Sequence, residues 1–202
     1  MPLSLHSFDL SVSVIIPVYN GGENLRRCLA SLEKALPAPI EIIVVTDGEG
    51  DGAWRVAEYF KVRLLRIDGP GGPARARNMG AEIARGEIFL FLDSDVSIYP
   101  DTIGKIAVTF QKHPHLAAVF GSYDDDPFET NFTSRFKNLF HHHIHQTSNE
   151  IASTFWGACG AIRKDVFRRL GGFDERYKRP SIEDIELGLR LKEGGYPVTG
   201  VS

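Results

Sequence analysis

The chain has 202 residues, of which 43% are hydrophobic and 24% charged, and its formal net charge is −3. This composition is typical of a globular protein with a sizeable core, and the lack of a basic excess argues against a nucleic-acid-binding surface. No apolar run reaches the roughly 18 residues of a membrane span, and no signal peptide opens the chain, so we expect a cytoplasmic protein. Cys28 and Cys159 are expected to be free, buried thiols.

Short apolar runs alternate with segments of helical periodicity in the first half of the chain. We expect strands at 11–17, 41–46, 62–67 and 88–92, and helices at 23–36, 53–60 and 74–84. The first helix is expected to bury one apolar face, made of Leu25, Cys28, Leu29, Leu32 and Leu36. This alternation predicts a Rossmann-like α/β fold, an α/β/α sandwich around a mainly parallel sheet.

The second half is less regular. A helix after Pro100 is followed by a strand at 116–123, an amphipathic helix at 132–145, a short helix before Gly171 and a helix at 182–192. No repeat or linker divides the chain. We therefore expect one domain over 1–202, with a nucleotide-binding half at about 10–100 and an acceptor-side half at about 101–202.

Two carboxylates follow the most apolar predicted strand. Asp93 and Asp95 come directly after residues 88–92, at the carboxyl edge where open α/β sheets bind ligands. Carboxylate oxygens suit Mg²⁺ or Mn²⁺, and such a cation completes its shell with water and substrate phosphates. The alternative is an ordinary turn before Pro100.

A second acidic position, Asp47, ends the strand at 41–46, so the two positions together fit a nucleoside diphosphate bound with a metal. The segment after the first strand lacks the G-x-G-x-x-G of dinucleotide-binding proteins, and a P-loop is also missing. The glycine-rich stretch 69–73 is either a phosphate-binding loop or a rigid turn. Arg75, Arg77 and Asn78 follow it, as partners for phosphate or carboxylate or as solvated side chains.

Six motifs occur in order along the chain: Val14–Asn20, Ile43–Gly48, Ala76–Asn78, Phe91–Asp95, Gly171–Glu175 and Glu183–Asp184. Together they resemble the family-2 inverting glycosyltransferases of the GT-A fold, over nearly the whole chain. The resemblance implies transfer of a sugar from a nucleotide-sugar donor to an acceptor hydroxyl on a glycan, a lipid-linked molecule or another compound. It also implies a Mn²⁺ or Mg²⁺ ion and a role in glycan biosynthesis.

The resemblance also implies roles for individual residues. Those expected to contact the nucleotide are Pro17, Tyr19, Asn20, Asp47, Arg75, Arg77 and Asp93. Asp95 would bind the metal with help from Asp93, and Asp184 would be the catalytic base, with Glu183 as the next candidate. Trp156, Gly157, Ala158 and Cys159 are expected to line the sugar or acceptor pocket, although a strand packed in the core would have the same pattern.

The chain departs from the family pattern at three places. Thr46 stands where such enzymes usually have the first of two aspartates, which leaves the base preference open. No Gln-x-x-Arg-Trp follows Asp184, which favours a single transfer over polymerisation. Many relatives continue beyond the position of Ser202 with a histidine metal ligand and membrane helices, so this chain is expected to be a catalytic domain truncated at its C-terminus.

Alternatives remain at this stage. A non-catalytic nucleotide-sugar or glycan-binding module could share the fold. A sugar-phosphate nucleotidylyltransferase would carry an Arg-containing glycine-rich signature after the first strand, which is not found.

The helix at 132–145 either packs on its own sheet or touches the inner face of a membrane, and His141 and His145 in it could share an ion. Ser181 and Asp184 also have the spacing of a capping box, in which Ser181 caps the helix and Asp184 is a helix-start residue rather than the base.

Overall fold

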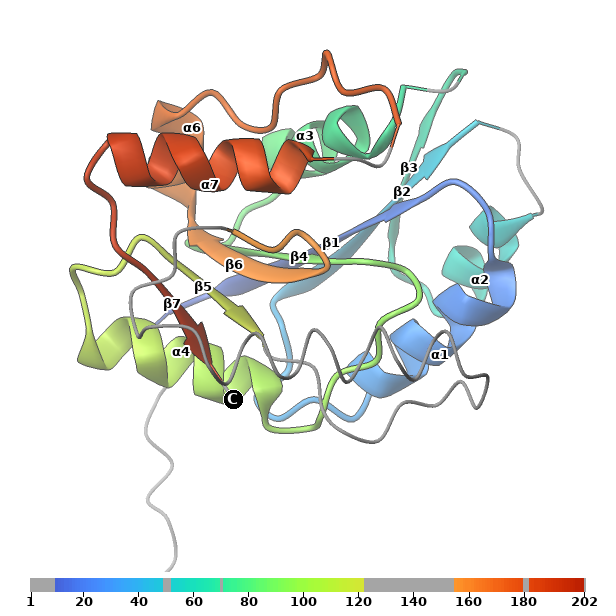
Figure 1. Ribbon diagram of the computed structural model, residues 1–202. Coiled ribbons are helices and arrows are strands. Elements are labelled where there is room, and N and C mark those ends of the chain that lie inside the picture. The colour runs from blue at the N-terminus through green and yellow to red at the C-terminus, as the bar shows by residue number, and fades with distance from the viewer. Residues whose placement is uncertain (1–9, 49–51, 70, 122–154, 180–181, 202) are drawn as a thin grey trace, which may run out of the picture.

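The computed structural model describes residues 10–48, 52–69, 71–121, 155–179 and 182–201. In this part of the chain, seven strands form one sheet in the order β3-β2-β1-β4-β6-β5-β7 (Figure 1). The strands are β1 (Val12–Val18), β2 (Glu41–Asp47), β3 (Arg63–Ile67), β4 (Ile88–Leu92), β5 (Ala118–Gly121), β6 (Cys159–Arg163) and β7 (Val198–Val201).

The sheet is mainly parallel, as predicted. Strands β3, β2, β1 and β4 pair in parallel, and β5 pairs in parallel with β7. Strand β6 lies between β4 and β5 and is antiparallel to both. It is therefore the one strand of the described sheet that runs against the others, and it brings residues 155–158 back to the carboxyl end of β4.

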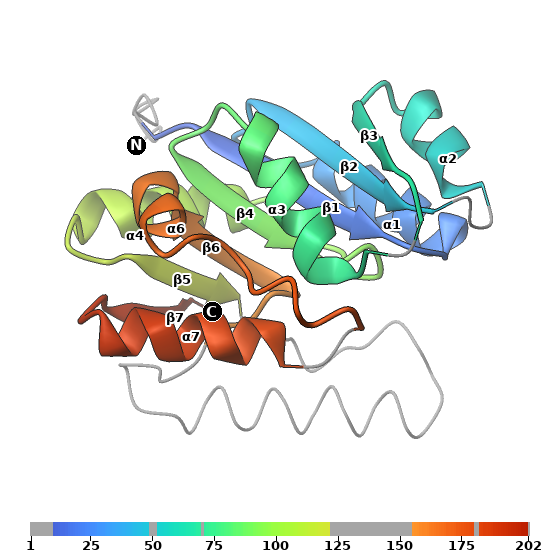
Figure 2. The ribbon, with the colours of Figure 1, turned by 90° about the horizontal axis from the view of Figure 1, so that it is seen from above.

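Helices cover both faces of the sheet (Figures 1 and 2). One face packs against α1 (Gly22–Leu32), α2 (Ala53–Tyr59) and α4 (Thr102–Lys112). The other packs against α3 (Pro73–Ile83), α6 (Lys164–Arg169) and α7 (Glu183–Glu193). The predicted α/β/α sandwich is confirmed.

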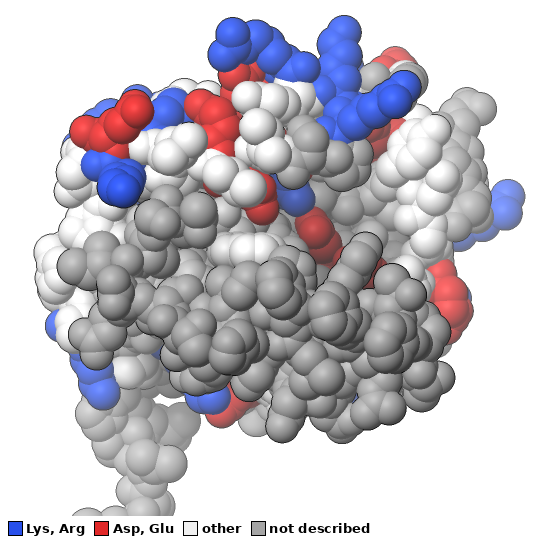
Figure 3. All heavy atoms as spheres, viewed as in Figure 1, with Lys and Arg blue, Asp and Glu red and all other residues white. Residues whose placement is uncertain are grey.

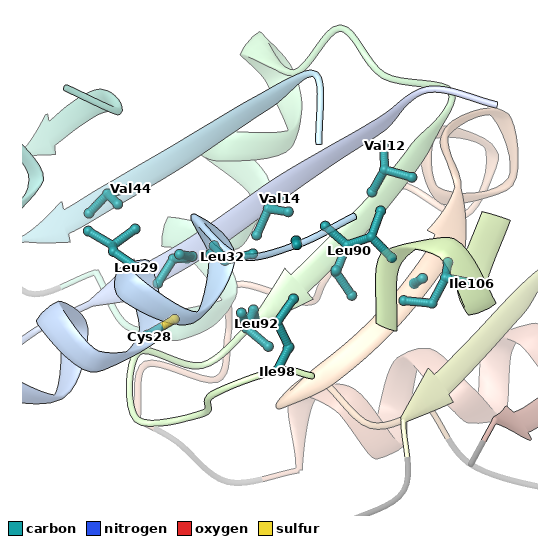
Figure 4. Close-up of a cluster of buried hydrophobic side chains, with 14 of the residues drawn as sticks. Val12, Val14, Cys28, Leu29, Leu32, Val44, Leu90, Leu92, Ile98 and Ile106 are labelled. Carbon is teal, nitrogen blue, oxygen red and sulfur yellow. The ribbon is translucent and has the colours of Figure 1, made fainter. Parts of the chain in front are cut away.

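Strand β4 shows why its sequence is apolar at every position. Ile88, Leu90 and Leu92 point into the core beneath α1 and α4, whereas Phe89 and Phe91 point into the core beneath α3, α6 and α7. A strand that is covered on both faces has no side available for polar residues. Figure 4 shows Leu90 and Leu92 in the first of these cores, with side chains from α1 and α4 around them.

Two predicted boundaries were wrong. The first helix ends at Leu32 rather than reaching Leu36, whose side chain is 75% exposed. Pro37 disfavours helical geometry at Leu36, and the Leu36 backbone N–H donates to the carbonyl of Pro100 at 2.7 Å instead. The strand predicted at 116–123 begins at Ala118 rather than Leu116, and its predicted end lies outside the described residues. Strand β7 was not predicted.

Some predictions concern residues outside the described ranges. The amphipathic helix at 132–145, with its histidines, and the capping role of Ser181 both fall there. Among the residues that are described, no helix is both long and apolar enough to cross a bilayer.

Candidate active site

The end of β4 places two carboxylates at the carboxyl edge of the sheet. The backbone N–H of Asp93 donates to the carbonyl of Ala158 at 3.0 Å, and Val96 N–H donates to the carbonyl of Asp93 at 3.0 Å. The chain thus turns directly after the strand. The Asp93 side chain is 35% exposed, and Asp95 is exposed. The segment is therefore a turn whose two carboxylates are accessible to solvent.

Arg77 links this strand end to the start of α7. Its guanidinium donates from Nη2 to Asp93 Oδ1 at 2.8 Å and from Nη1 to Glu183 Oε1 at 2.9 Å. The residue is 4% exposed, and its guanidinium lies 5.3 Å from the centroid of the Phe173 ring. Arg77, predicted to bind nucleotide, and Glu183, the alternative base, are thus paired with each other inside the protein.

Asp184 lies in the first turn of α7, where the helix dipole favours a negative charge. Its Oδ2 accepts a hydrogen bond from Gly157 N–H at 3.1 Å, and its Oδ1 accepts one from Ile185 N–H at 2.7 Å. A side chain at Gly157 would meet both Arg77 Cζ and Asp184 Cβ at 3.3 Å. Glycine at this position therefore allows the loop before β6 to pack against both side chains.

Negative charge exceeds positive charge at this site. Burial raises the pKa of Asp93, Arg77 opposes that rise, and the charges of Asp95 and Asp184 add to it. Together with Glu183, four carboxylates are gathered around the single guanidinium of Arg77. Figure 3 shows acidic and basic side chains side by side near the middle of the face seen in Figure 1.

The donor set fits a hard cation that is only partly coordinated by protein. No group of three or more His, Cys, Asp or Glu side chains is arranged to hold a metal within the described ranges. Asp93 and Asp95 supply carboxylate oxygens, and one or two carboxylates are the usual protein share for Mg²⁺ bound with substrate phosphates. A cation there would also offset the excess negative charge.

Asp47 contacts a glycine turn. Its Oδ1 and Oδ2 accept hydrogen bonds from the backbone N–H groups of Gly71 and Gly72, at 2.8 and 2.7 Å. Gly72 has a φ of 84°, and a Cβ there would lie 2.5 Å from the carbonyl oxygen of Lys178. The buried Asp47 carboxylate thus holds the turn that begins α3, a use of the two glycines that the sequence pattern does not indicate.

The other residues predicted to contact the nucleotide lie at the ends of β1 and α3. Pro17 is within β1, opposite Val45 of β2, whereas Tyr19 and Asn20 follow β1 and are exposed. The Tyr19 ring lies beside Gly48, with Cε2 3.9 Å from the position of a Cβ there. Arg75 lies along Gly71 at the start of α3.

The predicted pocket residues lie where β6 begins. Trp156 is half-buried against the core beneath α3, α6 and α7, and Cys159 pairs with Leu92 of β4. Cys28 and Cys159 are free, as predicted, and burial raises their thiol pKa values to about 12 and about 11. Both thiols are therefore protonated and weakly reactive at neutral pH.

Asn78, one of the residues considered as a ligand, contacts the protein instead. Its Nδ2 donates to the carbonyl of Phe173 at 2.8 Å, and its Oδ1 accepts from Phe173 N–H at 2.9 Å. Arg77 and Asn78, adjacent in the sequence, thus hold two different segments that lead to the start of α7. The sequence singled out the Gly171–Glu175 motif, but it could not show that Asn78 is the residue that contacts this motif.

Known proteins share this fold and these sequence features. Residues 13–171 match the family described as "Glycosyl transferase family 2". The chain is 32% identical to glycosyltransferase GlyG of Streptococcus pneumoniae over 126 residues, which cover 60% of this chain and 42% of GlyG.

Two solved structures are similar to this one. TarS 1–349 of S. aureus has a TM-score of 0.71 at 24% identity, covering 96% of this chain and 58% of TarS 1–349. A mannosyltransferase of Pyrobaculum calidifontis, in complex with GDP-Man and Mn²⁺, has a TM-score of 0.72 at 20% identity, covering 95% of this chain and 55% of the mannosyltransferase. The chain thus spans less than two thirds of the length of each of these proteins. The predicted fold and family are confirmed: the chain has the GT-A fold and belongs to glycosyl transferase family 2.

Proposed function

We propose that this chain is the catalytic part of a metal-dependent, inverting glycosyltransferase that moves one sugar from a nucleoside-diphosphate sugar to an acceptor hydroxyl. The observation that carries the proposal is the bridge made by Arg77. Its guanidinium contacts Asp93, at the end of β4, and Glu183, which is adjacent to Asp184. Candidate metal-binding and proton-accepting groups, which lie far apart in the sequence, thereby meet in one site.

The nucleotide is proposed to lie at the carboxyl ends of β1 and β2. Tyr19 and Asn20 are exposed there, and Tyr19 offers an aromatic face beside Gly48. Asp47 contributes indirectly, because its carboxylate already holds Gly71 and Gly72. Arg75 has no ion pair with any described residue and is available to a phosphate.

The metal, Mn²⁺ or Mg²⁺, is proposed to be held by Asp95 with help from Asp93. When bound, it supplies positive charge to the departing diphosphate. The Pyrobaculum mannosyltransferase, which shares the fold, holds both GDP-Man and Mn²⁺. The excess of carboxylates around Arg77 supports the same arrangement here, because a diphosphate could not otherwise approach so much negative charge.

Asp184 is proposed to act as the general base. One of its oxygens takes the proton of the acceptor hydroxyl while the hydroxyl oxygen forms a bond to the anomeric carbon of the sugar. The bond from that carbon to the diphosphate oxygen breaks on the opposite face, and its electron pair leaves with the nucleoside diphosphate. The configuration at the anomeric carbon is therefore inverted. Trp156, Gly157, Ala158 and Cys159 would line the sugar or acceptor side, with a glycan or a lipid-linked molecule as acceptor.

The test is an assay with a panel of nucleotide sugars and Mn²⁺ that measures free nucleoside diphosphate and pyrophosphate. We expect nucleoside diphosphate from one preferred donor, released slowly to water and faster when a hydroxyl acceptor is added. Release of pyrophosphate would indicate a nucleotidylyltransferase. Tight binding of a nucleotide sugar without any release, across a broad panel of acceptors, would indicate a binding module and overturn the proposal.

A further inference from the structure

Arg77 is held in place by the helix that carries it. Gly80, three residues later and on the same side of α3, lies so close to β1 that a Cβ would be 2.5 Å from Ile15 Cγ2. Only glycine allows this approach, and it presses α3 onto the sheet. Figure 2 shows α3 lying over the parallel strands. The base of the Arg77 side chain is therefore fixed relative to β1 and β4.

The Arg77 guanidinium connects the end of β4 with the start of α7. Within the described residues, no backbone hydrogen bond connects these two segments. Its Nη2 contacts Asp93, directly after β4, and its Nη1 contacts Glu183 on α7, a residue 106 positions away in the sequence. Arginine can bind two carboxylates at once because its donors form a rigid planar fork. Lysine carries a single ammonium group and cannot hold both in the same geometry.

The burial of Arg77 indicates a role beyond stability. The residue is 4% exposed, and its Nε has no hydrogen-bond partner among the described residues. Buried polar atoms are normally satisfied, and a buried ion pair is often no more stabilising than apolar residues of the same volume. An arginine in this position is therefore better explained by the geometry that it imposes.

We propose that Arg77 is a positioning residue that sets the placement of Asp184 relative to Asp93 and Asp95, rather than a ligand of the donor phosphates. The inference rests on the proposed function, in which Asp184 is the base and Asp95 binds the metal. Arg77 acts on Asp184 by two routes: it holds the neighbouring Glu183, and it packs against Gly157. The Gly157 N–H in turn donates to Asp184 Oδ2 at 3.1 Å.

The first arm of the test measures transfer. Arg77→Lys keeps the charge but removes the fork, so the kcat of transfer should fall about 10²-fold, as expected for a displaced reacting group. Because lysine keeps a positive charge beside Asp93, the donor KM from kinetics and the affinity for Mn²⁺ alone from calorimetry should change much less than kcat. If Arg77 acts through Asp184, the double variant Arg77→Lys with Asp184→Asn should transfer sugar no more slowly than Asp184→Asn alone. Multiplying losses, or a rise in donor KM with kcat unchanged, would overturn the inference in favour of an independent or phosphate-binding role.

The second arm does not need activity. Hydrogen exchange at the Gly157 amide, followed by NMR, should become faster in Arg77→Lys because Asp184 no longer holds that N–H. The control is Arg63→Lys, which alters an arginine that bridges Glu41 and the carbonyl of Ile83 at the other end of the sheet. It should leave Gly157 exchange unchanged.

If Arg77→Lys does not fold, Glu183→Gln replaces it, since the amide keeps the shape and one acceptor but loses the charge. Unchanged Gly157 exchange in the folded variant would overturn the inference. If the variant shows faster Gly157 exchange but the wild-type protein transfers no sugar, only the proposed function is overturned. The failure of the inference and the failure of the proposed function can therefore be told apart.

Discussion

Carboxylates lie beside arginine at both ends of the sheet, but with opposite charge balance. At the amino end, the side chain of Glu41 is 5% exposed and receives hydrogen bonds from Ser13 Oγ at 2.7 Å, Arg85 N–H at 2.6 Å and Arg63 Nη1 at 3.1 Å. One carboxylate there is surrounded by two guanidinium groups. At the carboxyl end, one guanidinium serves several carboxylates.

The pKa values of Glu41 and Asp93 shift in opposite directions. Burial alone would raise the pKa of Glu41, but the hydrogen bonds from Arg85, Ser13 and Arg63 outweigh it and the pKa is lowered. Burial raises the pKa of Asp93, and Arg77 does not overcome that effect. The amino end is thus electrostatically complete, whereas the carboxyl end lacks positive charge that a bound cation would supply. Perturbed groups of the second kind are typical of functional sites.

The largest effect is expected when divalent metal is withheld from the carboxyl end. With excess EDTA, sugar transfer should fall to the background of the assay and return when Mn²⁺ or Mg²⁺ is added in excess. Asp95→Asn should raise the Mn²⁺ concentration needed for half-maximal activity by at least about tenfold, since even indirect partners of a metal contribute that much. The control is Asp101→Asn, an exposed acid paired with Lys105. Full turnover in EDTA would rule out the metal.

A second prediction concerns the base. Asp184→Asn keeps the shape and the acceptor oxygen for one backbone N–H but removes the proton acceptor. Transfer should fall by about 10²- to 10⁴-fold, while nucleotide binding and the melting temperature stay nearly unchanged.

Asp165→Asn is the matched control, because Asp165 also lies in the first turn of a helix but pairs with Arg169 on the surface. It should keep full activity. If Asp184→Asn melts much earlier yet transfers sugar at the wild-type rate, Asp184 is only a helix-start residue.

The smallest effect is expected at the amino end, and on stability alone. Glu41→Gln should lower the free energy of unfolding by about 1–3 kcal/mol at neutral pH, because the buried Ser13 hydroxyl, the Arg85 N–H and two partly exposed guanidinium groups lose a charged acceptor. The pKa of Glu41 is lower in the folded state than the ordinary glutamate pKa of 4.5. Its contribution to the free energy of unfolding is therefore complete above pH 4.5 and is lost as the pH falls through the folded-state pKa.

Urea unfolding at a series of pH values should therefore show wild type and Glu41→Gln converging in acid. Sugar transfer by the folded variant should equal that of wild type at neutral pH. A stability difference that persists unchanged in acid would mean that packing, not charge, distinguishes Glu41.

The local elements of the fold could be predicted because local patterns determine them. The run at 88–92 is apolar at every position, and it is a strand covered on both faces. The helical spacing of Leu25, Cys28, Leu29 and Leu32 correctly indicated a buried helix face. Asp93 and Asp95 could be placed at a sheet edge for the same reason, because a strand that ends in carboxylates must present them where the strand ends.

Tertiary structure decided how the strands pair and which side chains meet at the carboxyl end of the sheet. Strand β6 enters between β4 and β5 in the antiparallel direction, and the four-residue β7 pairs with β5, although neither pairing has a distinctive local pattern. The roles of Arg77 and Asp47 depend on the same long-range contacts. In the sequence both look like ligands for a nucleotide, because arginine and aspartate have the same chemistry toward a protein partner as toward a substrate.

Only packing brings Glu183 to Arg77 and the Gly71–Gly72 turn to Asp47. Residue type and spacing thus determined which groups could take part in the chemistry. Contacts between segments far apart in the chain decided which of these groups are paired within the protein and which, like Asp95, are exposed to solvent.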